Sequence, residues 1–256
     1  KLKRNKPSSQ TANKTAPQEQ ESTIALPQAQ LSSPESYILL PEKIHKDLEG
    51  EYSYPDLLVA MHKLSLNVPE VQKAALSLTQ KLNPQRTANN QSLLEIKNTF
   101  QEQNGHGYIG NINHEIALQL NQEAGNFTLT QRQGLDFLIE LQQGIDNKIK
   151  VYDGTGSKIH KNKLIQVYNE ISEKRAPWRS EWLANKFKEL SGILHMSYPV
   201  IENNSIKEVI APLENYLREN CLVDLSDFDR LGMPKGKSSD NSYKQGKNIF
   251  YWYPIN

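Results

Sequence analysis

The segment DLSDFD places three carboxylates close together along the chain, at Asp224, Asp227 and Asp229. Three acids at this spacing could share a divalent cation, and a hydrolase with dispersed carboxylates could use either this cluster or Glu181. A full set of cation ligands is not visible around the cluster. We therefore interpret the aspartates as capping and solvated residues, and predict neither a metal ion nor a named catalytic residue. Because catalytic residues can be dispersed in sequence, enzymatic activity stays open.

Two other motifs resemble ligand sites but lack a required part. GHGYIG, from Gly105 to Gly110, matches the glycine pattern of dinucleotide-binding turns, yet the residues before it have helical periodicity where a strand is needed. DGTGSKIHKNKL begins like a calcium loop at Asp153, but Lys158 replaces the glycine of that loop and Leu164 its bidentate glutamate. We interpret the first as a glycine loop between two helices and the second as a turn, and we predict no cofactor.

Histidine and cysteine residues give no clear site. Cys221 is the only cysteine, which excludes an intramolecular disulfide and favours a small buried hydrophobic residue. Neither zinc-ligand spacing nor an HExxH pattern occurs among the six histidines, which are His45, His62, His106, His114, His160 and His195.

The segment RAPWRSEWLANKF contains two tryptophans four residues apart. Pro177 suits the first turn of a short helix, so the two rings would share one face. They could fill a seam between packed elements, or form a platform for a carbohydrate or peptide beside the charged residues. An aromatic run, NIFYWYPI, lies near the C-terminus. The candidate binding residues are Trp178, Arg179, Glu181, Trp182, Tyr251, Trp252 and Tyr253.

Composition sets limits on the partners. The 256 residues carry 30 basic and 29 acidic groups, and a net charge of +1 gives no field that favours nucleic acid, so we expect no nucleic-acid partner. Residues 1–35 are rich in Gln, Ser, Thr, Asn and Pro, which predicts a disordered linker or tail. The basic cluster KLKRNK at the start is typical of the flank of a removed hydrophobic span, or of an ordinary solubilising tail. The first interpretation implies an N-terminal membrane anchor outside the given residues.

The first half of the ordered chain reads as helical. We expect helices over residues 53–64, 68–82 and 93–100, then one after Asn111 or Asn113 and one after Thr128 or Thr130. Asn83-Pro84, Gly125 and Gly144 are expected to end the second, fourth and fifth helix. Short helices with short connections indicate an irregular bundle over residues 36–147.

The second half, residues 148–256, mixes both kinds of element. We expect a β-hairpin at 148–160, a helix carrying Leu164 and Tyr168, strands at 192–201 and 205–211, a helix at 211–220, a polar loop at 232–247 and a buried strand at 248–255. The predicted fold class is α+β, with an α-helical N-terminal half and a mixed α+β C-terminal half.

Six segments together resemble a family of uncharacterised archaeal proteins. They are YSYPDLLVAM, YIGNINHEIALQLN, FTLTQRQGLDFL, KVYDGTGSKI, APWRSEWLANKFKELSGILHMSY and QGKNIFYWYPIN, and they span most of residues 50–256. Members of this family continue beyond the YWYP strand into a tail with scattered variable positions. That tail is similar to those of the variable target proteins of diversity-generating retroelements, which have a C-type-lectin-like fold.

The resemblance implies a ligand-binding or display protein, in which this chain is the constant body of a variable receptor. It implies a protein or carbohydrate ligand, a place at the membrane or cell surface, and an α+β domain truncated at Asn256. The alternatives are a structural or scaffold protein and the hydrolase with dispersed carboxylates.

Overall fold

The computed structural model describes residues 24–25, 33–62, 66, 68–97, 108–172, 183–202, 205–213 and 216–251. Its helices are α1 (Pro69–Ala88), α2 (His114–Glu123), α3 (Gln131–Ile145) and α4 (Lys161–Ser172), with a short 3-10 helix at Pro34–Ser36. Its strands are β1 (Ile24–Ala25), β2 (Tyr37–Leu40), β3 (Lys43–Asp47), β4 (Gly50–Tyr54), β5 (Leu57–Ala60), β6 (Glu95–Lys97), β7 (Tyr108–Gly110), β8 (Lys186–Leu190), β9 (Ile193–Glu202), β10 (Ser205–Pro212), β11 (Cys221–Asp224) and β12 (Asn248–Tyr251).

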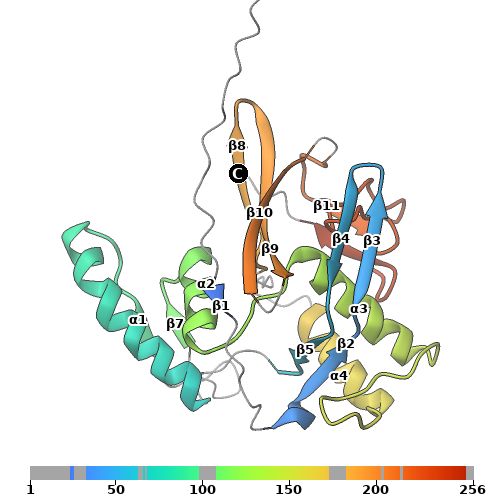
Figure 1. Cartoon of the computed structure of the whole chain (residues 1–256), viewed down its shortest axis with the longest axis horizontal. Coiled ribbons are helices and arrows are strands. Elements are labelled where there is room, and N and C mark those ends of the chain that lie inside the picture. Colours follow the sequence, from blue (N-terminus) through green and yellow to red (C-terminus); the bar gives the residue numbers. More distant parts are fainter. Residues whose placement is uncertain are drawn as a thin grey trace, which may run out of the picture.

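The predicted fold class is wrong, because helices and strands alternate along the whole chain (Figure 1). The end of β4 and all of β5 stand where the first helix was expected, and β6 lies within the expected third helix. In β4 the buried side chains are Tyr52 and Tyr54, two residues apart, which is a strand period. Pro55 follows directly, and β5 pairs with β2 over its whole length. This pairing between strands far apart in the sequence outweighs the helical spacing of the leucines.

The second, fourth and fifth expected helices and the helix carrying Leu164 are found, as α1, α2, α3 and α4. Asn113 caps α2, since its side chain accepts a hydrogen bond from the backbone N–H of Ile116. Thr130 caps α3 in a reciprocal capping box with Gln133. The end predicted for α1 at Asn83-Pro84 is wrong, because the helix continues to Ala88. There the Asn83 side chain holds the backbone of Leu94 through two hydrogen bonds, which ties the last turns to the segment that follows.

The largest sheet has the strand order β1-β10-β9-β8, and every pair in it is antiparallel. Strands β9 and β10 were expected. The helix predicted at 211–220 is wrong, because β10 runs to Pro212 and residues 216–220 are not helical. Ala211 and Leu213 continue the inward alternation of β10, and the N–H of Leu213 bonds to the carbonyl of Leu194 at 2.8 Å.

Three further predictions from the sequence have different outcomes. The predicted tail lies mostly outside them, although Ile24–Ala25 form β1. The glycine loop at 105–110 is wrong for Tyr108–Gly110, which form β7 and pair with β6. The turn at Asp153 is found, and its carboxylate accepts hydrogen bonds from the backbone N–H groups of Thr155 and Ser157. Those bonds stabilise the turn at Asp153.

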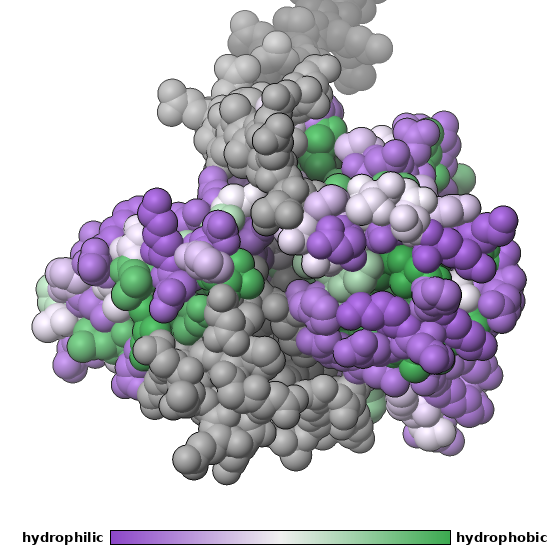
Figure 2. Space-filling model, turned by 90° about the horizontal axis from the view of Figure 1, so that it is seen from below, coloured by the Kyte–Doolittle hydropathy of each residue, from purple (hydrophilic) through white to green (hydrophobic). Residues whose placement is uncertain are grey.

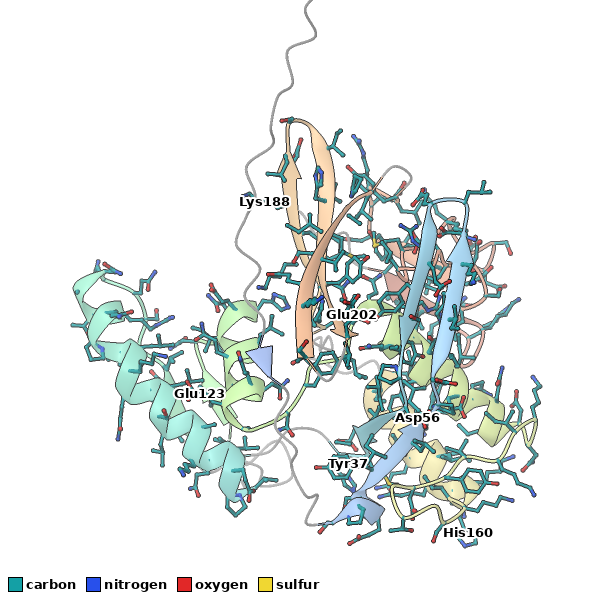
Figure 3. The ribbon with its side chains drawn as sticks, in the orientation of Figure 1. Tyr37, Asp56, Glu123, His160, Lys188 and Glu202 are labelled. Carbon is teal, nitrogen blue, oxygen red and sulfur yellow. The ribbon has the colours of Figure 1, made fainter. Side chains whose placement is uncertain are left out.

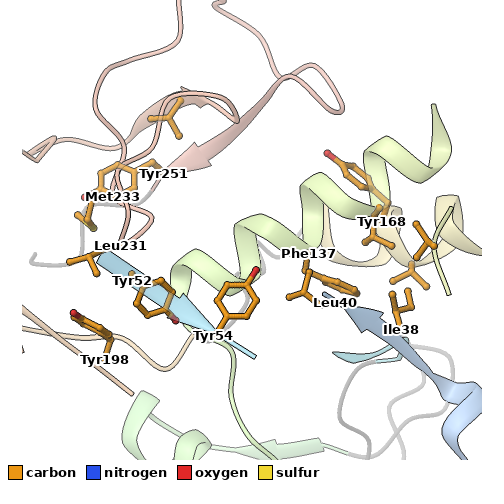
Figure 4. Packing of buried hydrophobic residues seen from close by; sticks show 14 of the residues in the cluster. Ile38, Leu40, Tyr52, Tyr54, Phe137, Tyr168, Tyr198, Leu231, Met233 and Tyr251 are labelled. Atoms are coloured by element: carbon orange, nitrogen blue, oxygen red, sulfur yellow. The ribbon is translucent and has the colours of Figure 1, made fainter. Parts of the chain in front are cut away.

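The main core joins elements from both halves of the chain. Leu40 of β2, Leu141 of α3, Tyr168 of α4, Met196 of β9 and Val223 of β11 are all 0% exposed (Figure 4). The predicted boundary between residues 147 and 148 stays a prediction, although this one core draws side chains from both sides of it.

A second, smaller core lies between α1 and α2. Val71, Ala75 and Leu78 of α1 pack with Leu120 of α2, and β6 and β7 lie beside them. These elements stand apart on the left of Figure 1. In Figure 2 hydrophobic atoms are exposed on the left of the molecule. Leu76 of α1 is 48% exposed. We call α1, β6, β7 and α2 the small lobe.

Candidate functional site

The structure gives little support to the candidate binding residues that were predicted from the sequence. Six of them, Trp178, Arg179, Glu181, Trp182, Trp252 and Tyr253, lie outside the described residues. Tyr251 lies in β12, is 7% exposed, and its hydroxyl donates to the carbonyl of Leu217 at 3.3 Å. Its ring is therefore part of the core and does not form a surface platform.

Two of the three aspartates of DLSDFD, Asp224 and Asp229, serve separate turns. Asp224 accepts a hydrogen bond from the hydroxyl of Ser238 at 2.5 Å. Asp229 accepts from the backbone N–H groups of Leu231 and Met233, as a capping residue does. Burial raises the pKa of Asp229, although those two N–H groups oppose the shift. Within the described ranges, no three His, Cys, Asp or Glu side chains lie close enough to hold a metal ion.

A cluster of buried charges lies where the β3–β4 hairpin packs on α3. In the hairpin, Lys43 stands opposite Tyr54 and His45 opposite Tyr52, so all four side chains share one face. On α3, three ionisable residues follow each other at intervals of four and also share a face. We call the whole contact the polar joint; it consists of Lys43, His45, Tyr54, Arg132, Asp136 and Glu140.

Asp136 is the centre of the polar joint. One carboxylate oxygen accepts hydrogen bonds from Nε2 of His45 and from the hydroxyl of Tyr54, both at 2.7 Å. The other accepts from Nη2 of Arg132 at 2.8 Å. Nζ of Lys43 lies 3.9 Å from Asp136 and 3.8 Å from Glu140. The buried carboxylate is thus surrounded by donors, which a buried charge requires.

Burial sets the protonation of the groups around this carboxylate. Burial, followed by the charge of Asp136, raises the pKa of Tyr54, so its hydroxyl stays a donor. Burial raises the pKa of Tyr52 to about 12. Burial also raises the pKa of Glu140, although Lys43 opposes this, and the charge of Asp136 adds to the rise. Burial, together with the neighbouring carboxylate of Asp136, therefore disfavours a charge on Glu140.

The segment after β11, which leads into the polar loop, closes over one end of α3. Nη1 of Arg230 pairs with Asp47 at 3.0 Å and with Glu49 at 2.8 Å, which fixes the tip of the β3–β4 hairpin. Gln131 donates to the carbonyl of Gly232 at 2.7 Å. The loop thus covers the first turn of α3 and joins it to the hairpin.

Chemically, the polar joint orients an imidazole. His45 is partly exposed and its ring is held by a carboxylate, an arrangement that also occurs in general acid–base catalysis. However, Asp136 already accepts from three side chains, and each of them comes from the hairpin or from α3 itself. The arrangement is that of an internal contact between two elements, and buried ion networks commonly have this role.

The large sheet has one surface that packs on the core and one that faces outward. The inward side chains of β9 are Leu194, Met196 and Tyr198, and the last packs edge-on against Tyr52 with ring centres 5.7 Å apart. The outward side chains are open, and we call them the open face. From one end to the other the registers place Leu190 beside Ile193, then Lys188, His195 and Pro212, then Lys186, Ser197 and Ile210, then Pro199 and Glu208.

The open face combines exposed aliphatic groups with a short polar network. Ile193 and Ile210 are each 50% exposed and Leu190 is 37% exposed. Next to Ile210 along β10, the carboxylate of Glu208 accepts a hydrogen bond from the Ser197 hydroxyl and lies 3.4 Å from Nζ of Lys186. Figure 3 shows Lys188 on β8 near one end of this sheet and Glu202 near the other end.

The sequence reasoning missed both surfaces. The signal for the polar joint was present in α3, since Arg132, Asp136 and Glu140 recur every four residues on the side that also carries apolar residues. The open face had no comparable signal, because β8 was not expected as a strand.

Comparisons with models of protein families, with curated proteins and with solved structures find no match to this chain. No helix among the described residues has the length and hydrophobicity needed to cross a bilayer.

Proposed function

We propose that this chain is a non-catalytic binding protein whose ligand is a polypeptide. The observation that carries the proposal is the open face, where Leu190, Ile193 and Ile210 are exposed on strands whose other side is fixed in the core. Exposed aliphatic side chains around polar groups are a common composition of binding surfaces. The resemblance to display proteins motivates the same proposal independently.

The described carboxylates support binding over hydrolysis. Asp224 and Asp229 serve separate turns, and the acids of the polar joint are paired with residues of the same contact. A purely structural role remains the competing hypothesis, and the following experiment separates the two.

A selection from a random-peptide phage library, with the immobilised protein as target, tests the proposal. The double variant Ile193→Asp, Ile210→Asp places charges on the open face. It should bind the selected peptides at least tenfold more weakly than the wild type does. Thermal unfolding should change little, because both side chains are half exposed. Ile44→Asp is the matched control, since Ile44 is 63% exposed on another surface and should leave binding unchanged. Failure to enrich any peptide, or equal binding by the double variant, would favour the structural role.

A further inference from the structure

The side chains of the open face form rows that run across its strands. Leu190 and Ile193 stand opposite each other and form an apolar row. Lys188 and His195 form the next row, two residues further along both strands, and Ile210 lies in the row after that. Neighbouring rows are about 7 Å apart, since each residue of a strand rises roughly 3.3 Å. A basic row therefore lies between two rows that carry exposed aliphatic side chains.

The two lysines of this face differ in their surroundings. Nζ of Lys186 lies 3.4 Å from the carboxylate of Glu208, so these two charges offset each other within the sheet. Lys188 is also exposed, and it forms no ion pair with any residue in the described ranges. Its positive charge is thus left uncompensated in that part of the chain, with aliphatic groups on both sides of it.

His195 adds a second polar group to the row of Lys188. Its Nδ1 lies 3.0 Å from the carbonyl oxygen of Ile193, and because a carbonyl only accepts, Nδ1 is the donor in this bond. Nε2 is then the ring nitrogen that can contact a ligand, and it donates when the ring is protonated. Side chains directly opposite each other in a ladder are close enough to contact one group. A single carboxylate can therefore accept from both Lys188 and His195.

We propose that the polypeptide ligand of the open face carries an acidic side chain between two apolar ones, and that its carboxylate pairs with Lys188. This inference rests on the proposed function and specifies the chemistry of its ligand. The two apolar side chains cover Ile193 on one side and Ile210 on the other, where each is half exposed. The carboxylate fixes the register of the contact, because a basic residue at the same place would be repelled.

A polypeptide fits this face better than a polyanion does. Nucleic acids are held by several lysines or arginines that neutralise successive phosphates. On the open face the charge of Lys186 is already offset by Glu208, and aliphatic side chains flank Lys188. One acidic side chain with apolar neighbours matches this pattern of one charge among aliphatic groups.

Peptides selected on the wild-type protein provide the first test. Their sequences should share an aspartate or glutamate with an apolar residue on each side. Lys188→Glu should bind such a peptide about tenfold more weakly, because attraction is replaced by repulsion, and added salt should weaken binding to the wild type. Lys150→Glu is the matched control, since Lys150 is exposed in the connection between α3 and α4 and should leave binding unchanged.

Exchange of the two charges tests whether the pair is direct. A peptide with lysine in place of its acidic residue should bind the wild type at least tenfold more weakly and should regain affinity for Lys188→Glu. A general loss of folding in that variant would not produce such a recovery, and thermal unfolding checks it separately.

The outcomes separate this inference from the proposed function. Enriched peptides that are weakened by Ile193→Asp, Ile210→Asp but lack an acidic residue, or that bind Lys188→Glu normally, would overturn the pairing with Lys188 and leave the open face as the binding surface. A selection without any enriched peptide would overturn both proposals.

Discussion

Asp136 shows how one side chain can decide the arrangement of two elements. It accepts hydrogen bonds from His45 and Tyr54 of the hairpin and from Arg132 of its own helix. Removal of one partner from such a group leaves a buried charge incompletely satisfied, which costs more than the single bond contributes. The polar joint therefore fixes the β3–β4 hairpin on α3 through its polar groups as well as through its tyrosine rings.

Glu140 should make the protein more stable in mild acid. Its pKa is raised by burial, so the folded state binds a proton more readily than the unfolded chain does. The corresponding stability is complete below the model-peptide value of 4.5 and is lost as the pH rises through the folded value. Urea unfolding of wild type and Glu140→Gln between pH 4 and 7 should show the wild type losing stability relative to the variant as the pH rises. A difference independent of pH would contradict this.

The contribution of Asp47 to stability should depend on pH in the opposite direction. Partial burial opposes ionisation, but hydrogen bonds from the backbone N–H groups of Arg230 and Glu49 and from the Arg230 side chain lower its pKa. Its contribution is present above 3.8 and is lost as the pH falls through the lower folded value. When the same titration is extended below pH 4, the advantage of wild type over Asp47→Asn should therefore shrink, and this provides the internal control for Glu140.

At the scale of elements, Gly232 determines how closely the polar loop can approach α3. Its φ is +85°, and an added Cβ would lie 2.8 Å from the backbone nitrogen of Arg132. Gly232→Ala should therefore destabilise the fold by roughly 2–5 kcal/mol, from backbone strain together with the clash. Chemical denaturation measures this. Gly125→Ala is the control, since Gly125 has a φ of +76° but nothing within 4 Å of an added Cβ. Equal losses in both variants would show that the close approach is unimportant.

The elements that the sequence predicted well are those with local signals. Helices α2 and α3 begin at Asn113 and Thr130, where a side chain caps the first turn. Strands β2, β5 and β6 were missed because their pairing partners lie elsewhere in the chain, as in the pairing of Leu57 with Leu40. The polar joint depends on the same non-local pairing. Periodicity could have indicated its α3 face, but no local pattern places His45 beside Asp136.

At the scale of the whole molecule, the described residues form two separate cores. The small lobe buries its own side chains around Leu78, and the main core is built around residues such as Leu141. A described link between the lobe and the remainder is the hydrogen bond of 2.6 Å between Nε2 of His114 and the carbonyl of Leu183. Separate cores with few links tend to open separately, as independent cooperative units.

Paired core truncations should reveal that independence. Leu78 is 1% exposed and Leu141 is 0% exposed, so replacement of either by alanine should cost about 2–5 kcal/mol in the unit that contains it. Hydrogen exchange should quicken in α1 and α2 for Leu78→Ala, while α3 and β9 keep their wild-type rates, because the main core loses no contact. Leu141→Ala should quicken exchange in α3, α4 and β9. If Leu78→Ala instead quickened exchange throughout the chain, the lobe and the main core would form one cooperative unit, and the open face would depend on the stability of both.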